Sequence, residues 1–264
     1  MQPLIPFFQA STIDVLGLFT IQVFGTLLVT GVALGSYLTL RAVHRQGLSS
    51  DEMVGFFPWL YCGLFAGGIL GQFLFYQVPV SATQPTGYLR LNWGVSSMGG
   101  FALASSFAVL YFKSHVRRWA YGDALVEGTA AGLLIARIGC FAVHDHPGKP
   151  THFWLGVHGI CPGGPASMAC HDLGLYEAGL ALIVLGTFSL LRRVPRRDGS
   201  LVVAFCLVYG GGRFMLEWLR HPAIDPRVLG LTPAQYGCLC IMVLGIWLHY
   251  RQRQTALSHD VSAG

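Results

Sequence analysis

Seven apolar runs, each long enough to cross a lipid bilayer, constrain this chain more than any other feature. A helix rises about 1.5 Å per residue, so about 20 residues span a hydrocarbon core of about 30 Å. The runs cover approximately residues 19–40, 54–76, 95–112, 122–143, 173–191, 200–218 and 233–250. We therefore predict an all-α integral membrane protein with seven transmembrane helices, forming a single membrane domain over residues 1–264.

Composition supports a membrane protein and excludes an ordinary soluble domain. Hydrophobic residues make up 53% of the 264 positions, and charged residues make up 11%. The N-terminal residues 1–14 lack a positively charged start and a small-residue cleavage site, so we do not expect a cleaved signal peptide. We expect a short interfacial helix there.

The cationic residues are divided unevenly between the two sets of linkers. The linkers after the first, third, fifth and seventh runs hold eleven of the seventeen: Arg41, Arg45, Lys113, Arg117, Arg118, Arg192, Arg193, Arg196, Arg197, Arg251 and Arg253. The other linkers hold Arg90, Lys149, Arg220 and Arg227. The positive-inside rule then predicts the N-terminus outside and the C-terminus in the cytoplasm. The net charge of +5 reflects this topology, so the expected partner is the lipid bilayer and not nucleic acid.

The two remaining arginines, Arg137 and Arg213, lie inside apolar runs near the same outer depth. A charge within a membrane span is costly and by default marks a functional site. Two interpretations stay open. Arg213 and Glu217, spaced i, i+4, could form an ion pair that serves to hide a charge. Alternatively, the guanidinium groups of both arginines bind a lipid phosphate, whose oxygens match their planar forks. Tyr176 and Glu177, where the fifth run begins, are placed to orient one of them.

The longest outer connection, residues 143–172, is rich in histidine. It contains His144, His146, His152, His158 and His171, together with Asp145 and Asp172. A histidine tuned by an adjacent carboxylate can serve as a general base. Zinc ligation is one alternative, but the spacing matches no compact zinc motif, so we assign no metal and no cofactor. The other alternative is a purely interfacial, hydrogen-bonding role, which would account for most of the five histidines. A disulfide between Cys161 and Cys170 is expected if this side is oxidising, with two free thiols as the alternative.

Residues 136–148 read Ala-Arg-Ile-Gly-Cys-Phe-Ala-Val-His-Asp-His-Pro-Gly. This run resembles the signature of the bacterial prolipoprotein diacylglyceryl transferases. That signature is Gly-Arg-hydrophobic-Gly-Asn-Phe, followed by a Glu and then a Gly. Arg137, Gly139, Phe141 and Gly148 match it. Further similar positions follow in the family's order over the whole chain: Gly67, Gly68, Gly71, Phe75, Tyr76, Gly94, Gly99, Gly100, Tyr176, Glu177, Tyr209, Gly210, Arg213, Phe214, Glu217, Arg220 and Gln235.

Five positions depart from the family pattern. Met98 stands where the family has His, Cys140 where it has Asn, Asp145 where it has Glu, Phe24 where it has Tyr and Ile69 where it has Arg. The lipid-phosphate residues are therefore kept, and the side that would handle the acceptor is altered.

The resemblance implies transfer of diacylglyceryl from phosphatidylglycerol to the lipobox cysteine of a lipoprotein precursor peptide, in the bacterial inner membrane. It implies a thioether product and glycerol 1-phosphate as the leaving group. The expected catalytic residues are His144, His146, Asp145, Arg137 and Arg213. The expected substrate-binding residues are Arg137, Gly139, Cys140, Gly148, Tyr176, Glu177, Arg213, Glu217, Gly99 and Gly100. Three alternatives stay open: a related lipid-modifying transferase, a hydrolase, metal-assisted or not, and an inactive lipid- or lipoprotein-binding paralogue.

Overall fold

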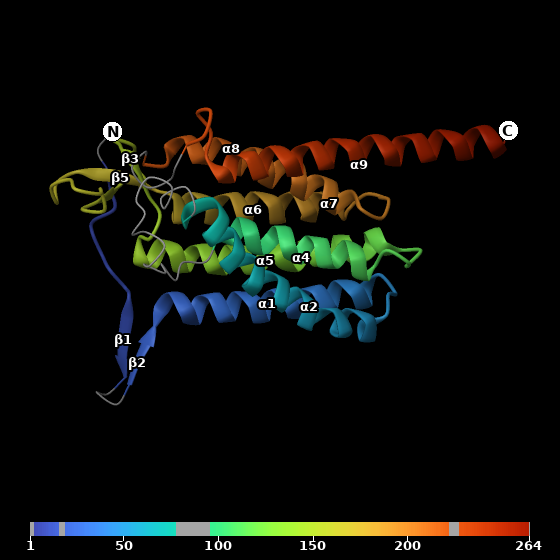
Figure 1. Cartoon of the computed structure of the whole chain (residues 1–264), viewed down its shortest axis with the longest axis horizontal. Coiled ribbons are helices and arrows are strands. Elements are labelled where there is room, and N and C mark those ends of the chain that lie inside the picture. Colours follow the sequence, from blue (N-terminus) through green and yellow to red (C-terminus); the bar gives the residue numbers. More distant parts are fainter. Residues whose placement is uncertain (1–2, 16–18, 78–95, 222–226, 264) are drawn as a thin grey trace.

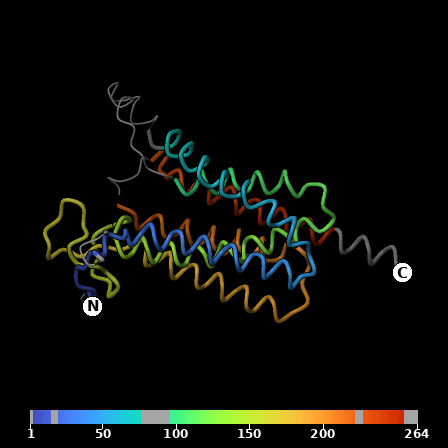
Figure 2. The backbone as a smooth tube through the Cα atoms, turned by 90° about the horizontal axis from the view of Figure 1, so that it is seen from below, coloured from blue at the N-terminus to red at the C-terminus, as the bar shows by residue number. Residues whose placement is uncertain are grey.

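Long helices lie side by side in one bundle, and short strands gather near one end of it (Figure 1). The computed structural model describes residues 3–15, 19–77, 96–221 and 227–263. Helices α1, α5 and α6 pack in succession, and α2 packs on α4. The α2–α4 pair lies to one side of α1, α5 and α6 (Figure 2). We call the end that carries strands β3 and β5 the strand end; the C-terminal helix runs to the opposite end (Figure 1).

Every predicted apolar run is helical over most of its length. The helices are α1 (Val23–Arg45), α2 (Ser50–Gln72), α4 (Ser97–Tyr111), α5 (Arg118–Val143), α6 (Leu173–Leu191) and α9 (Pro233–Ala263). A π-helical segment, η1 (Phe73–Gln77), continues α2. The sixth run combines α7 (Ser200–Ala204), the π-helical η3 (Phe205–Tyr209), α8 (Gly210–Leu216) and the 3₁₀ segment η4 (Glu217–Leu219).

Five of these helical stretches are long and apolar enough to cross a membrane, among the residues that the structure describes. They are residues 23–45, 50–75, 118–143, 173–191 and 200–219. Helix α4 is apolar but has 15 residues. The chain is therefore a multi-pass membrane protein built from helices, as predicted.

The N-terminal segment corrects two predictions. The expected interfacial helix over residues 1–14 is wrong where the chain is described, because strand β1 (Thr12–Val15) lies there and residues 3–11 are not helical. The first run begins with strand β2 (Phe19–Gln22), so its helix starts four residues later than predicted. The two strands pair antiparallel, with Ile13 opposite Ile21. Both are rich in β-branched residues, which fit a pleated strand better than a helix.

The histidine-rich connection contains a small antiparallel sheet. Its strands are β3 (Pro147–Pro150), β4 (Val157–His158) and β5 (Ala169–Asp172), in the order β3-β5-β4. The predicted disulfide between Cys161 and Cys170 is confirmed, with their Cα atoms 5.3 Å apart. It joins the connection after β4 to β5. Arg90 and Gly94, which the sequence analysis names, lie outside the described residues.

Several helices begin at a side chain that satisfies their first backbone amides. The Ser49 hydroxyl accepts from the Glu52 amide at 3.3 Å, and the Asp172 carboxylate accepts from the Leu175 amide at 3.2 Å. Before α9, the Thr232 amide donates to Gln235 Oε1 at 3.0 Å, and the Gln235 amide donates to Thr232 Oγ1 at 3.3 Å. This reciprocal pair is a capping box, and it fixes where α9 starts.

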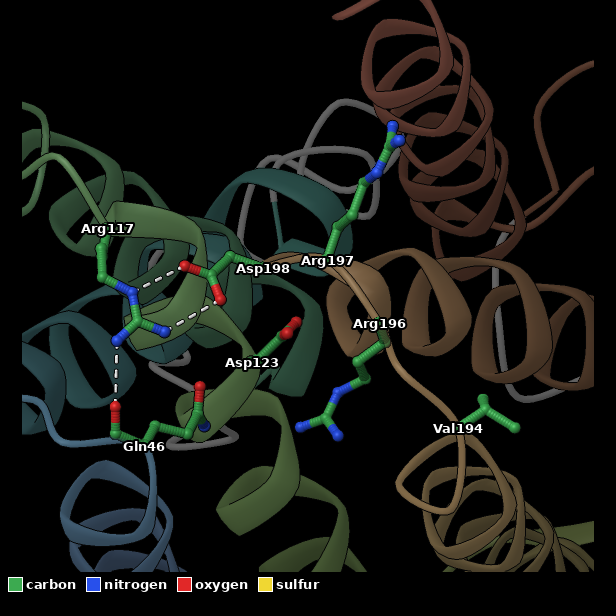
Figure 3. Close-up of a pocket in the computed structure, with 7 residues that line it drawn as sticks. All are labelled: Gln46, Arg117, Asp123, Val194, Arg196, Arg197 and Asp198. Atoms are coloured by element: carbon green, nitrogen blue, oxygen red, sulfur yellow. Dashed lines mark hydrogen bonds and ion pairs between the residues drawn. The ribbon is translucent and has the colours of Figure 1, made fainter. Parts of the chain in front are cut away.

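The linkers at the opposite end are tied together by ion pairs. Glu127 of α5 accepts from Arg45 at 2.7 Å and from Arg192 at 2.7 Å. Arg117 donates from Nε to Asp198 at 2.9 Å, beside a cavity of about 240 Å³ (Figure 3). The cavity is lined by Gln46, Arg117, Asp123, Val194, Arg196, Arg197 and Asp198. The linkers predicted to share one membrane side therefore meet at one end of the bundle.

Glycines allow α1 and α5 to approach closely. A Cβ on Gly128 would lie 2.0 Å from Thr39 Oγ1 and 2.2 Å from the Gly35 carbonyl oxygen. Small residues at such contacts are common between membrane helices, because they let the backbones touch.

We predict that Gly128→Ala lowers stability by about 1–3 kcal/mol, since the added methyl group overpacks the α1–α5 contact. The matched control is Gly186→Ala in α6, where a Cβ meets nothing within 4 Å. Thermal unfolding in detergent, followed by circular dichroism, compares the two. Equal unfolding temperatures for the two variants would contradict this packing account.

Candidate functional site

A buried cluster of ion pairs joins α5, α6 and the end of the sixth run at the strand end. Glu177 of α6 lies between two arginines. Its Oε2 atom is 2.9 Å from Arg137 Nη2 and 3.3 Å from Arg213 Nε. One carboxylate thus bridges two guanidinium groups from different helices.

Glu217 extends this cluster along the chain. It accepts hydrogen bonds from Arg213 Nη1 and, at 3.2 Å, from Thr232 Oγ1. It also forms an ion pair with Arg220, whose Nε lies 2.9 Å from Glu217 Oε1. The i, i+4 pair expected from the sequence is present. However, it is one link of a network and does not stand alone. We call Arg137, Glu177, Arg213, Glu217 and Arg220 the arginine cluster.

The two kinds of side chain in the arginine cluster differ in exposure. Both glutamate side chains are 0% exposed, whereas the side chains of Arg137, Arg213 and Arg220 are 8%, 7% and 10% exposed. All five side chains are therefore buried, and what exposure there is belongs to the arginines. Three arginines and two glutamates leave one net positive charge, which suits a singly charged anion such as a phosphodiester. Buried ion pairs add little net stability over apolar residues, so stability alone does not account for the cluster.

His144 forms the corner where α5 ends. Its backbone is left-handed, with φ of 53°, and its ring is nearly buried. Nδ1 is 2.6 Å from Asp172 Oδ2, and Nε2 is 2.7 Å from the Phe8 carbonyl oxygen. Both ring nitrogens are therefore engaged, and the side chain ties the N-terminal segment and the start of α6 to the end of α5.

His146 and Asp145 have a different environment from His144. Their side chains meet through Nδ1 and Oδ1 and are 25% and 36% exposed. The His146 backbone is held in place, since its carbonyl oxygen accepts from the Leu173 amide at 3.1 Å. The structure brings this pair to the last turn of α5, where the Cys140 sulfur lies 3.7 Å from Arg137 Nη1.

Gly148 lies against the arginine cluster through the backbone. It forms an isolated bridge with Arg220, and a Cβ there would lie 2.6 Å from the Leu219 carbonyl oxygen and 2.9 Å from His171 Cβ. Glycine is required because two backbones touch. Strand β3 is thereby fixed beside the end of the sixth run.

The other predicted glycines lie in helix contacts. A Cβ on Gly139 would lie 3.2 Å from Leu27 Cβ of α1. A Cβ on Gly99 would lie 2.2 Å from the Gly67 carbonyl oxygen, and one on Gly100 would lie 2.7 Å from the Leu64 carbonyl oxygen. Gly99 and Gly100 therefore lie where α4 packs on α2.

Three residues bond to predicted site residues but are not predicted as their partners from the sequence. Asp172 has a readable signal, because an aspartate directly before an apolar run is a typical helix N-cap. Thr232 also has one, since Thr-Pro-Ala-Gln matches the capping-box pattern. Phe8 has none, because it acts through its backbone carbonyl oxygen.

The Tyr176 side chain contacts the sheet, whereas its neighbour Glu177 contacts the arginines. Its hydroxyl lies 2.8 Å from His171 Nδ1. Burial lowers the pKa of His171, because desolvation disfavours the charged imidazolium form. In the folded protein this histidine therefore holds its proton less tightly than it does in the unfolded chain.

We predict that this difference makes stability depend on pH. At low pH the unfolded chain binds a proton on His171 more readily than the folded protein does. The contribution of His171 to the free energy of unfolding is therefore complete above the unfolded pKa of about 6.5 and is lost as pH falls below it. His171→Gln should therefore flatten the fall of the unfolding temperature between about pH 7 and pH 5. His158→Gln, in the same sheet, is the control. An unchanged slope in His171→Gln would refute the prediction.

Fold and site together define a multi-pass helical membrane protein with a positively charged, largely buried site at one end of its helices. Comparison with known proteins then narrows the class. A sequence profile described as prolipoprotein diacylglyceryl transferase matches residues 11–251. The chain belongs to this family, as its signature residues suggested.

Curated relatives agree with the profile and match over nearly their full length. Proteins named phosphatidylglycerol–prolipoprotein diacylglyceryl transferase were found in several bacteria. The one from Cereibacter sphaeroides is 31% identical, over 90% of this chain and 96% of the relative. The one from Roseobacter denitrificans is 29% identical, again over 90% and 96%. The one from Phenylobacterium zucineum is 29% identical, over 89% and 90%.

Proposed function

We propose that this protein transfers the diacylglyceryl group of phosphatidylglycerol to the cysteine thiol of a lipoprotein precursor. The arginine cluster carries this proposal, since it places a net positive charge among buried groups where a lipid phosphate can bind. The names of the relatives supply the donor and the acceptor. The products are a thioether and glycerol 1-phosphate.

Arg137 and Arg213 act on the donor lipid. The thiolate sulfur attacks the glycerol carbon that bears the phosphate, a carbon–sulfur bond forms, and the carbon–oxygen bond to the phosphate breaks. The electron pair stays on the phosphate oxygen, whose group goes from one negative charge to two. Fixed guanidinium groups in a site of low dielectric stabilise that additional charge in the transition state. Glu177 and Glu217 hold the guanidinium forks in position.

His146 and Asp145 act on the acceptor thiol. The thiolate is the nucleophile, so a nearby group must take the thiol proton. His146 is partly exposed, is hydrogen bonded to Asp145 and follows the span that carries Arg137. His144 holds the corner through its two engaged nitrogens, which favours a positioning role. Asp145 orients His146 in this scheme.

The remaining predicted residues support these two groups. Cys140 lies beside Arg137, Gly148 lies beside Arg220, and Gly139 lets α5 approach α1. Tyr176 supports the sheet through its bond to His171, and Gly99 and Gly100 let α2 and α4 pack together.

The proposed topology has seven spans, with α4 and α9 added to the five apolar helices. The N-terminus lies outside and the C-terminus in the cytoplasm of a bacterial inner membrane. The strand end then faces outside, and the arginine-rich opposite end lies in the cytoplasm. Phosphatidylglycerol and the precursor peptide would both reach the site from the outer half of the bilayer.

Complementation tests the function directly. A bacterium depleted of its own diacylglyceryl transferase is given this chain, and labelled lipid is followed into lipoproteins. Restored growth and labelling are expected. If the chain reaches the membrane and no lipoprotein becomes labelled, the proposed activity is wrong and an inactive paralogue or another acceptor replaces it.

We predict that Arg137→Gln and Arg213→Gln each lower turnover at least about 100-fold, because each removes a donor from the leaving phosphate. Lysine at either position should rescue poorly, since it offers a point charge in place of a fork. Transfer from phosphatidylglycerol to a precursor peptide is measured in reconstituted vesicles. Arg117→Gln at the opposite end is the control and should keep normal turnover. Near-normal rates in both site variants would rule out the phosphate role.

A further inference from the structure

Three potential metal ligands converge on the last turn of α5. The Cys140 sulfur, a carboxylate oxygen of Asp145 and a ring nitrogen of His146 all lie within 4.8 Å of one another. Thiolate, imidazole and carboxylate together form a donor set that zinc prefers. Three protein ligands leave one position of a tetrahedral zinc ion open, as in catalytic zinc sites.

The backbone around these ligands is fixed by bonds that use none of the ligand atoms. The left-handed residue His144 turns the chain at the end of α5, and its ring is bonded to Asp172 and to Phe8. The Leu173 amide then holds the carbonyl oxygen of His146. The chain after the corner is thereby directed back over Cys140, so the three ligands are brought together before any ion arrives.

Exposure and charge also fit a zinc site with an open position. Cys140 is 5% exposed, whereas the side chains of His146 and Asp145 are 25% and 36% exposed. The thiol therefore lies at the base, and the other two ligands lie on the side that reaches solvent. Thiolate and carboxylate balance the two charges of the ion. Arg137, which lies beside the sulfur, is itself paired with Glu177 at 2.9 Å.

We propose that Cys140, Asp145 and His146 bind a zinc ion, and that its open position binds the acceptor cysteine as a thiolate. This rests on the proposed function. The incoming thiol displaces a zinc-bound hydroxide, which leaves as water with the thiol proton. Zinc then holds the nucleophilic sulfur beside the arginine cluster, and a metal-bound thiol is deprotonated at neutral pH. His146 serves as a ligand while the ion is bound, and the hydroxide takes the proton.

Zinc content tests the site independently of activity. The full chain is purified from membranes without chelator, and zinc is measured per chain by mass spectrometry. One zinc ion per chain is expected, falling at least about tenfold in Cys140→Ser and in His146→Gln. Cys62→Ser, on an exposed cysteine of α2, should keep the metal. Cobalt substitution should give a thiolate-to-cobalt absorption band that Cys140→Ser abolishes and Cys62→Ser keeps.

Activity with and without metal then tests the role of the ion. Chelator should abolish transfer from phosphatidylglycerol, and added zinc should restore it. Full transfer by metal-free protein would overturn the zinc proposal and leave the proposed function intact. Zinc bound in full with no transfer to any precursor peptide would instead overturn the proposed function, and with it the thiolate role. Zinc content below about 0.1 per chain even after zinc loading would overturn the site itself.

Discussion

The bridge that Glu177 makes between Arg137 and Arg213 is the interaction on which the rest of this structure depends. A carboxylate with no exposure is stable there because two guanidinium groups neutralise it, and each arginine is tolerated because it has that partner. The bridge joins three helices at one depth. The bridge requires the first turn of α6 to pack closely against the end of α5. A Cβ on Gly174 there would lie 2.7 Å from the Phe141 amide nitrogen.

The bond between His144 and Asp172 places the residues proposed to act on the acceptor thiol next to this bridge. His144 ends α5 and links it to Asp172 at the start of α6, so the turn that carries Asp145 and His146 cannot move far from Arg137. Gly148 continues the same path into the sheet and against Arg220. Arg137 and the groups proposed to act on the thiol therefore lie on one continuous stretch of chain, and Gly148 fixes that stretch against Arg220 of the arginine cluster. This proximity is what a transfer between two bound substrates needs, because reacting atoms must be held in contact.

Much of the helical frame could be predicted from the sequence, since bilayer thickness sets the length of each apolar run. The shared depth of Arg137 and Arg213 followed from the same topology. The bond between His144 and Phe8 could not be predicted, because its partner is a backbone carbonyl 136 residues away. The β1–β2 pairing is absent from the prediction, because the first predicted span includes residues 19–22 as helix. These residues form a strand, in keeping with their β-branched side chains. The capping box at Thr232 and Gln235, by contrast, has a sequence pattern from which it can be predicted.

Photolabelling of the lipid site tests the central claim most directly. Phosphatidylglycerol with a photoreactive group on its glycerol head is irradiated with the protein in vesicles, and the labelled peptides are mapped by mass spectrometry. The account predicts label at the strand end, within residues 137–148 and 213–220, and loss of that label in Arg137→Gln/Arg213→Gln. Label that persists in this double variant, or that maps to the cavity beside Arg117 and Arg196, would contradict it.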